Sequence, residues 1–199
     1  MPRIFSTASG NTSQIIAECV ETLKAGGVIL LPTETVYGLV CRFEDKNAEE
    51  KIYQLKHRPA EKRLSVFVDD AAKLEKYDVR LNKLAHSLTE EYCPGAITII
   101  SARGENSSLG FRIPDHDFVL QLLNALDFPL SSTSANRSGM PNVLCVDEAL
   151  SELDGEVDIV IDGGRIPEYS QASTVVDARG EKALILRQGA LIINNKFLS

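Results

Sequence analysis

The most reactive-looking segment of this chain is P-T-E-T-V-Y-G, which runs from Pro32 to Gly38 directly after the apolar run 28–31. It carries three hydroxyls and one carboxylate within five residues. Hydroxyls both donate and accept hydrogen bonds, so such a cluster suits a small polar ligand. The alternative is a threonine-rich strand of ordinary β propensity, and spacing alone leaves both interpretations open.

A second candidate segment is basic. Residues 51–63 hold five lysine or arginine side chains against one glutamate, a local charge of +4 in a chain whose net charge is −7. Clustered cations concentrate anions, and arginine binds phosphate oxygens through two parallel hydrogen bonds. The alternative is the solvated end of a helix, where cations favour the helix dipole.

A third segment, S-S-T-S-A-N-R-S-G at 131–139, follows the apolar residues 128–130. Small hydroxyl residues, asparagine and glycine let backbone N–H groups approach a ligand, so this segment could hold a phosphate or a ribose. The same residue types also form ordinary loops. Single cations lie at Arg112 in F-R-I-P and at Arg187 in R-Q-G, and S-T-V-V-D begins at Ser173.

Several common site types are absent from the sequence. It contains no G-x-x-x-x-G-K-[ST] phosphate loop, no G-x-G-x-x-G fingerprint, no G-x-S-x-G elbow and no H-E-x-x-H. The four cysteines lie far apart, which excludes the close cysteine pair of a typical zinc site, and with no secretion signal at the N-terminus we expect reduced thiols in a cytoplasm. No apolar run approaches the roughly 20 residues that cross a bilayer.

The composition is that of a globular domain: 44% of the residues are hydrophobic and 25% are charged. Helical and strand-like patterns alternate, which predicts one α/β domain over residues 1–199 with helices packed on a twisted sheet. Asn47 and Glu50 predict a capping box at the start of the second helix. Helices are expected at 12–25, 47–58, 81–92, 117–126 and 146–153, and strands at 28–31, 65–68, 96–101, 111–113, 129–133, 157–161, 174–177 and 184–186.

The order of the motifs is more specific than any one of them. L-P-T-E-T-V-Y-G-L, K-H-R-P, P-G-A-I-T, F-R-I-P, S-T-S-A-N-R-S-G, S-T-V-V-D and R-Q-G follow one another between about residues 17 and 189. In this order and spacing they resemble the YrdC-like threonylcarbamoyl-AMP synthases, in their short, single-domain bacterial form. The resemblance implies a single YrdC/RibB-like α/β domain, with a twisted mixed β-sheet flanked by helices and a basic concave cleft.

The family resemblance also implies an activity. Members join L-threonine, bicarbonate and ATP into threonylcarbamoyl-AMP and pyrophosphate, as nucleotidyltransferases of the cytoplasm. The adenylate then passes to a transferase complex that modifies adenosine 37 of tRNA. Mg²⁺ is expected to arrive with ATP, since the sequence shows no dedicated protein metal site. Weak tRNA binding is a further expectation, and a membrane partner is not.

Site residues follow from the matching motif positions. Lys56 and Arg58 are expected to stabilise negative charge on the phosphates as the catalytic cations. By resemblance, threonine would contact Thr33, Tyr37, Arg112 and Ser173. By the same resemblance, ATP would contact Lys56, Arg58, Lys62, Thr98, Ser134, Asn136, Asn142 and Arg187. The chain departs from longer relatives at 63–68, where a ligand-binding histidine of those relatives has no counterpart in Phe67.

Two other functions compete with the synthase. One is an RNA-binding module that acts in tRNA or rRNA maturation without catalysis. The net charge of −7, the absence of tryptophan and an aromatic content of 6% argue against it. The other is a non-catalytic ligand-binding or maturation domain, because the same domain occurs inside larger carbamoyl-transfer proteins. Pyrophosphate release that requires both threonine and bicarbonate would separate all three.

Overall fold

One continuous, twisted, mixed sheet organises the computed structural model, which describes residues 1–198. Its strand order is β1-β9-β2-β3-β8-β4-β7-β6-β10-β11, and β5 pairs with β6 off this path. The strands are β1 (Arg3–Ser6), β2 (Ile29–Leu31), β3 (Gly38–Arg42), β4 (Ser65–Phe67), β5 (Val79–Arg80), β6 (Ile97–Arg103), β7 (Ser107–Arg112), β8 (Leu130–Ser134), β9 (Ile159–Asp162), β10 (Thr174–Asp177) and β11 (Leu184–Arg187).

The helices confirm the expected helical segments, with small shifts at their ends. The α-helices are α1 (Thr12–Lys24), α2 (Lys46–Leu55), α3 (Lys83–Tyr92), α4 (Asp117–Asn124) and α5 (Val146–Glu152), with short 3₁₀ turns at Thr7–Ser9, Ala71–Tyr77 and Asn195–Phe197. None of the helices described within residues 1–198 is long and apolar enough to span a membrane.

The start and end of α2 differ from the prediction. The expected capping box of Asn47 and Glu50 is wrong, because the carboxylate of Asp45 accepts the N–H groups of Asn47 and Ala48, each at 3.1 Å. The helix also ends at Leu55 rather than at residue 58, since His57 adopts a left-handed backbone with φ of 48°. The basic residues that follow α2 are therefore free of the helix and lie on a loop.

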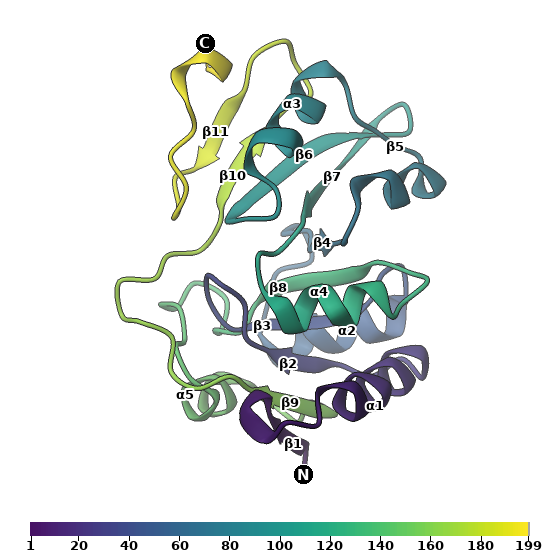
Figure 1. Cartoon of the computed structure of the whole chain (residues 1–199), viewed down its shortest axis with the longest axis vertical. Coiled ribbons are helices and arrows are strands. Elements are labelled where there is room, and N and C mark those ends of the chain that lie inside the picture. The colour runs from purple at the N-terminus through teal and green to yellow at the C-terminus, as the bar shows by residue number, and fades with distance from the viewer. Residues whose placement is uncertain (199) are drawn as a thin grey trace.

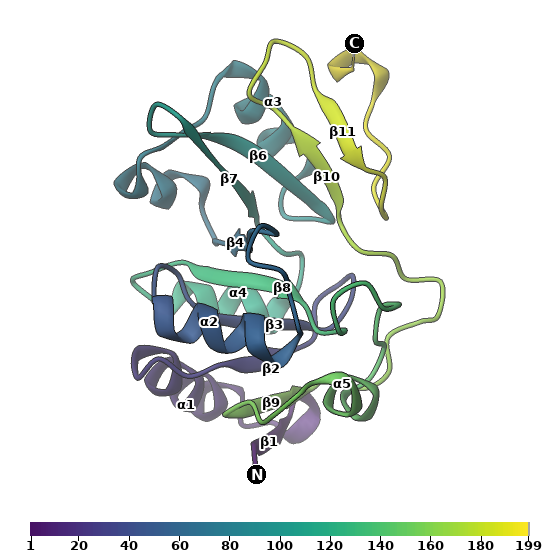
Figure 2. The same cartoon turned by 180° about the vertical axis from the view of Figure 1, so that it is seen from behind.

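Helices cover both faces of the first half of the sheet, formed by β1, β9, β2, β3 and β8 (Figures 1 and 2). Alternate side chains of a strand point to opposite faces. Ile29 and Leu31 therefore enter the core that α1 and α4 complete, whereas Val28 and Leu30 enter the core under α2 and α5. This half is covered on both sides, and its strand β8 adjoins β4.

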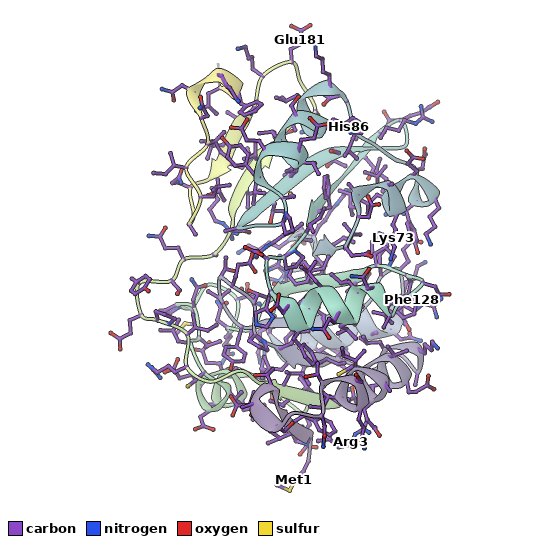
Figure 3. The ribbon with its side chains drawn as sticks, viewed as in Figure 1. Met1, Arg3, Lys73, His86, Phe128 and Glu181 are labelled. Atoms are coloured by element: carbon purple, nitrogen blue, oxygen red, sulfur yellow. The ribbon has the colours of Figure 1, made fainter. Side chains whose placement is uncertain are left out.

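The second half of the sheet, formed by β7, β6, β10, β11 and β5, has one covered face. Ile97 and Ile99 pack with the buried side of α3, whose His86 is exposed on the outer surface (Figure 3). Thr98 and Ile100, on the same strand, point to the opposite face and line a cleft. In Figure 1 α3 lies in front of β6, and in Figure 2 it lies behind, so Figure 2 shows the uncovered face.

Three strands were missing from the sequence prediction and one was too short. β1, β3 and β5 were not expected, and β7 begins at Ser107 rather than at residue 111. The polar residues Ser107 and Ser108 border the cleft, so this part of β7 lacks the apolar pattern that identifies a strand. The strand β3 is not predicted from the sequence, because its first residue, Gly38, is taken as the end of the hydroxyl-rich segment.

Candidate active site

A cleft of about 540 Å³ lies where the two halves of the sheet meet. Its wall combines β3 and β8 from the first half with β6, β7 and β10 from the second, together with residues of the 33–37 and 58–65 segments. The wall includes five arginines and one glutamate: Arg58, Arg63, Arg103, Arg112, Arg187 and Glu49. The lining is therefore strongly cationic within an acidic chain.

A buried turn organises the hydroxyl-rich segment. The Thr33 hydroxyl accepts the N–H groups of Thr35 and Val36, each at 3.2 Å, and donates to the carbonyl of Val36 at 2.7 Å. Thr33 and Thr35 are 5% and 2% exposed. The side chain of Thr33 thus fixes the backbone of the whole segment, and the Thr35 hydroxyl lies 2.9 Å from it.

Arg112 joins this turn from β7. It is only 5% exposed, and a buried cation needs partners. Its Nε donates to the Gly95 carbonyl at 3.2 Å, its Nη2 donates to the Thr35 hydroxyl at 2.9 Å, and the same Nη2 lies 2.6 Å from a carboxylate oxygen of Glu34. We call Thr33, Glu34, Thr35 and Arg112 the buried cluster. Its geometry is set before any ligand arrives.

A second polar group faces the cleft from β6, the start of β10 and the end of β11. The hydroxyls of Thr98 and Ser173 lie 2.8 Å apart. Arg187 donates to the Ser173 carbonyl through Nη2 at 2.8 Å and through Nε at 3.2 Å. Burial, and then the nearby cations Arg112 and Arg58, lower the pKa of Arg187 from its usual range. Three cations from distant parts of the chain therefore act on the same space.

The basic segment forms a loop, residues 58–63, which we call the strap. Arg58 holds it closed by donating to the carbonyls of Lys62 at 2.8 Å and Arg63 at 2.9 Å. Arg63 reaches β7 and donates to the Ser107 hydroxyl at 3.1 Å and the Ser108 carbonyl at 3.0 Å. The strap thus connects the end of α2 to the second half of the sheet along one side of the cleft.

Lys56 lies beneath the cleft wall rather than on it. It is 1% exposed, and its ammonium donates to the Thr133 hydroxyl at 3.1 Å and to the Ser134 carbonyl. Burial, with a contribution from Arg58, lowers the pKa of Lys56 to about 7. Its ammonium supports β8, and it reaches the cleft through the two residues that it binds.

Tyr37 reaches the wall with its hydroxyl already engaged. The hydroxyl donates to the Gly164 carbonyl at 2.7 Å and accepts the Gly163 N–H at 3.1 Å. Burial raises the pKa of Tyr37 to about 12. In this arrangement Tyr37 positions the loop after β9 against the buried cluster.

The structure brings eight of the twelve predicted site residues to one cleft wall: Thr33, Tyr37, Arg58, Thr98, Arg112, Ser134, Ser173 and Arg187. Four lie off that wall: Lys56, Lys62, Asn136 and Asn142. Lys62 and Asn142 are exposed. Asn136 is buried and donates to the carbonyls of Arg137 at 2.9 Å and Met140 at 2.7 Å, so it shapes the loop after β8.

Sequence reasoning missed four residues that the structure places at this site: Glu34, Thr35, Arg63 and Arg103. Two of them had a signal, because Thr35 and Glu34 stand inside the segment singled out for its hydroxyls and its carboxylate. Arg63 belonged to the basic run without an assigned role. Arg103 at the end of β6 had no signal at all, since only the β6–β7 pairing brings it to the cleft.

Carboxylates are scarce on the wall of the cleft. Within residues 1–198 no group of three or more histidine, cysteine, aspartate or glutamate side chains could hold an ion. The one wall carboxylate, Glu49, already accepts the Ser131 hydroxyl and the Glu44 N–H.

Comparison with known proteins agrees with this architecture. The sequence model of the Sua5/YciO/YrdC family, described as "Telomere recombination", matches residues 21–189. The chain belongs to this family. Its members share the mixed α/β fold that the structure shows, and the E. coli YciO crystal structure superimposes with a TM-score of 0.85 at 27% identity over the whole of both chains.

Three further proteins are similar to this chain. The mouse threonylcarbamoyl-AMP synthase is 36% identical over 94% of this chain and 70% of its own length. A putative threonylcarbamoyl-AMP synthase of Methanocaldococcus jannaschii is 33% identical over 96% of this chain and 93% of its own. The crystal structure of Pyrococcus abyssi Sua5 complexed with L-threonine has a TM-score of 0.83 at 26% identity, and this chain spans 57% of it.

Proposed function

We propose that this chain is a threonylcarbamoyl-AMP synthase, a nucleotidyltransferase that makes threonylcarbamoyl-AMP and pyrophosphate from L-threonine, bicarbonate and ATP. One observation carries the proposal: a buried arginine within a hydroxyl cluster shares a single cleft with three further arginines whose partners are neutral oxygens. The first arrangement suits a hydroxy amino acid and the second suits a polyphosphate. One relative is named a threonylcarbamoyl-AMP synthase, and another was crystallised with L-threonine.

Threonine is assigned to the buried cluster. A carboxylate can meet the Arg112 guanidinium in a fixed plane, because that fork is already anchored on two of its nitrogens. The hydroxyls of Thr35 and Ser173 lie on the same wall and can bond the polar groups of the amino acid. Thr33 and Tyr37 hold this surface in shape. The site is built before binding, which lowers the entropy cost of ordering it.

ATP is assigned to the strap side of the cleft. Arg58 and Arg187 would meet the phosphates, with Thr98 and Ser134 on the intervening wall. Lys56 would act from beneath β8 by fixing Ser134. Lys62, Asn136 and Asn142 remain predicted nucleotide contacts that need a movement of their loops. Mg²⁺ enters as part of the nucleotide substrate and neutralises phosphate charge there.

The chemistry requires three reactants in one place. The threonine nitrogen adds to bicarbonate and water leaves, which gives a carbamate. A carbamate oxygen then attacks the α-phosphorus of ATP, the bond from that phosphorus to the bridging oxygen breaks, and pyrophosphate departs. The cleft supplies proximity and orientation, and its cations stabilise the charge that grows on the leaving phosphates.

The cellular role follows from the same proposal. The product would pass to a transferase complex that modifies adenosine 37 of tRNA, which places the chain in the cytoplasm. Four free thiols are consistent with a reducing compartment.

Incubation with MgATP, bicarbonate and threonine should give threonylcarbamoyl-AMP by mass spectrometry, and pyrophosphate release should stop when threonine or bicarbonate is omitted. Folded protein that makes no adenylate contradicts the proposal. If the same protein instead binds RNA with a strong salt dependence, the RNA-binding alternative takes its place.

A further inference from the structure

The arginines of the cleft differ in what neutralises them. Arg58, Arg63 and Arg187 donate only to carbonyls and hydroxyls, so each keeps its full charge. Arg103 and Arg112 each lie against a carboxylate, that of Glu44 and that of Glu34. Among the wall arginines only Arg112 is both buried and neutralised, with side chains of Arg112 and Glu34 that are 6% and 19% exposed.

Glu34 has no other partner that would explain its position. Both of its carboxylate oxygens are buried, and apart from the ion pair with Arg112 neither has a hydrogen-bonding partner among residues 1–198. Burial favours the neutral forms of two titratable neighbours, because it lowers the pKa of His116 and raises the pKa of Cys93 to about 11. The charge of Glu34 is therefore directed at Arg112 alone.

The pairing leaves one edge of Arg112 available. Nε bonds Gly95 and Nη2 bonds Thr35 and Glu34, whereas Nη1 has no partner among the described residues. That nitrogen carries two N–H groups, either of which can donate to a carboxylate oxygen. The local charge is nevertheless close to zero, because the cation and the buried anion cancel. A site of this kind attracts a simple anion weakly and a zwitterion well.

We propose that Glu34 is a specificity-determining residue, which keeps the polyphosphate away from Arg112 and reserves that arginine for a zwitterionic amino acid. The proposal rests on the function proposed above. Phosphates are drawn to the three uncompensated arginines. At the buried cluster the ligand carboxylate meets Arg112, while the ligand ammonium is stabilised through space by the charge of Glu34, an effect that low dielectric strengthens.

The direct test is the variant Glu34→Gln, which keeps the shape of the side chain and removes its charge. Calorimetry measures threonine affinity with and without saturating tripolyphosphate. In the wild-type protein, tripolyphosphate should change the dissociation constant of threonine less than about twofold. In Glu34→Gln, tripolyphosphate should weaken threonine binding about tenfold, because it then occupies Arg112. Glu34→Asp should restore the wild-type behaviour, because it keeps the charge.

Glu44→Gln is the matched control, since it removes the carboxylate from Arg103 instead. It should leave the threonine–tripolyphosphate interference unchanged. Equal interference in wild type, Glu34→Gln and Glu44→Gln would overturn the proposal. If threonine does not bind the wild-type protein at all, the proposed function fails first, so the two failures are distinguishable.

A second measurement needs no variant. 3-Hydroxybutanoate is threonine without its amine, so it keeps the carboxylate, the hydroxyl and the methyl group. With Glu34 in place it should bind the wild-type protein at least tenfold more weakly than threonine, because nothing balances the buried anion. Equal affinities of the two compounds would contradict the role of Glu34, whether or not the variants fold.

Discussion

The buried cluster and the strap hold their arginines in opposite ways. Arg112 is 5% exposed and is fixed by a carboxylate, a hydroxyl and a carbonyl. Arg63 is exposed and is held only by the Ser107 hydroxyl and the Ser108 carbonyl. In the buried cluster, the Arg112 guanidinium is desolvated, fixed in position and neutralised by a carboxylate. In the strap, the Arg63 guanidinium keeps its charge and its contact with water.

This difference teaches how one cleft can separate two substrates. A small amino acid offers few contacts, so it needs a surface that is ordered in advance. A triphosphate carries several negative charges, so it can be attracted by cations whose positions are less strictly fixed. The uncovered sheet face between the two regions brings the reactants together.

The largest expected effect concerns stability. Arg112→Met should lower the free energy of unfolding by about 3–5 kcal/mol, because it leaves the Glu34 carboxylate buried without its counterion. Arg63→Met, the same substitution on the strap, should cost less than about 1 kcal/mol. Urea unfolding measures both. Similar losses in the two variants would remove the distinction between the regions.

Adding Glu34→Gln to Arg112→Met should return part of the lost stability, because the unpaired buried charge disappears. If the double variant is less stable than Arg112→Met alone, the ion pair is not the source of the loss.

The next effect is a pH dependence at Lys56, which is buried beneath β8. The pKa of Lys56 is about 7 in the folded chain against an ordinary value of 10.5. Between these values the unfolded lysine binds a proton that the folded one has lost, so the stability difference between wild type and Lys56→Met should rise with pH. The expected slope is up to about 1.4 kcal/mol per pH unit between pH 7 and 10, and it vanishes below the folded pKa.

Lys62→Met provides the control for that slope, because Lys62 is exposed on the strap. Its profile against pH is the reference for the Lys56→Met profile. A Lys56→Met profile no steeper than that reference would contradict the lowered pKa of Lys56.

A smaller effect tests the order of the buried cluster. Thr33→Val should lower the free energy of unfolding by about 1–3 kcal/mol, because the N–H groups of Thr35 and Val36 lose their buried acceptor. Thr98→Val, on the wall facing the strap, removes a single hydroxyl contact with Ser173 and should cost less. Thermal or urea unfolding decides, and an equal cost would mean that the Thr33 turn does not organise the segment.

The smallest effect belongs to the exposed end of the strap. Lys62→Ala should weaken ATP binding by no more than about threefold, and the difference from wild type should disappear at 0.5 M salt, because exposed charges are screened. Calorimetry at two salt concentrations measures it. A large loss that persists in high salt would mean that Lys62 closes onto the nucleotide and is desolvated there.

Much of the fold could be predicted from local pattern. The helical face of 12–25 was identified from its period, because that helix is buried on one side. The strand within the apolar run 28–31 was identified from its continuous apolar pattern, because both of its faces are buried. β7 was recognised only at its end, since its cleft-lining residues are polar. The cap of α2 was misplaced because Asp45, rather than Asn47, had the position to accept the free N–H groups.

The sequence predicted which residues belong to the candidate site better than it predicted how they are arranged. Motif order assigned Arg112 to threonine and Arg187 to ATP, and the structure places both on one cleft wall. The burial of Lys56 under β8 and the pairing of Glu34 with Arg112 could not be predicted, because both depend on how distant strands are registered. Sequence identifies polar residues near a site, whereas packing decides which of them face it.

The central claim is that one cleft holds threonine and ATP on separate sets of arginines. Calorimetry of Arg112→Lys and Arg58→Ala with each ligand alone tests it most directly, since lysine keeps the charge beside Glu34 and loses only the fork. Arg112→Lys should weaken threonine binding about ten- to a hundredfold and leave ATP binding unchanged. Arg58→Ala should weaken ATP binding by a similar factor and leave threonine binding unchanged. If Arg112→Lys loses ATP and keeps threonine, the division of the cleft proposed here is wrong.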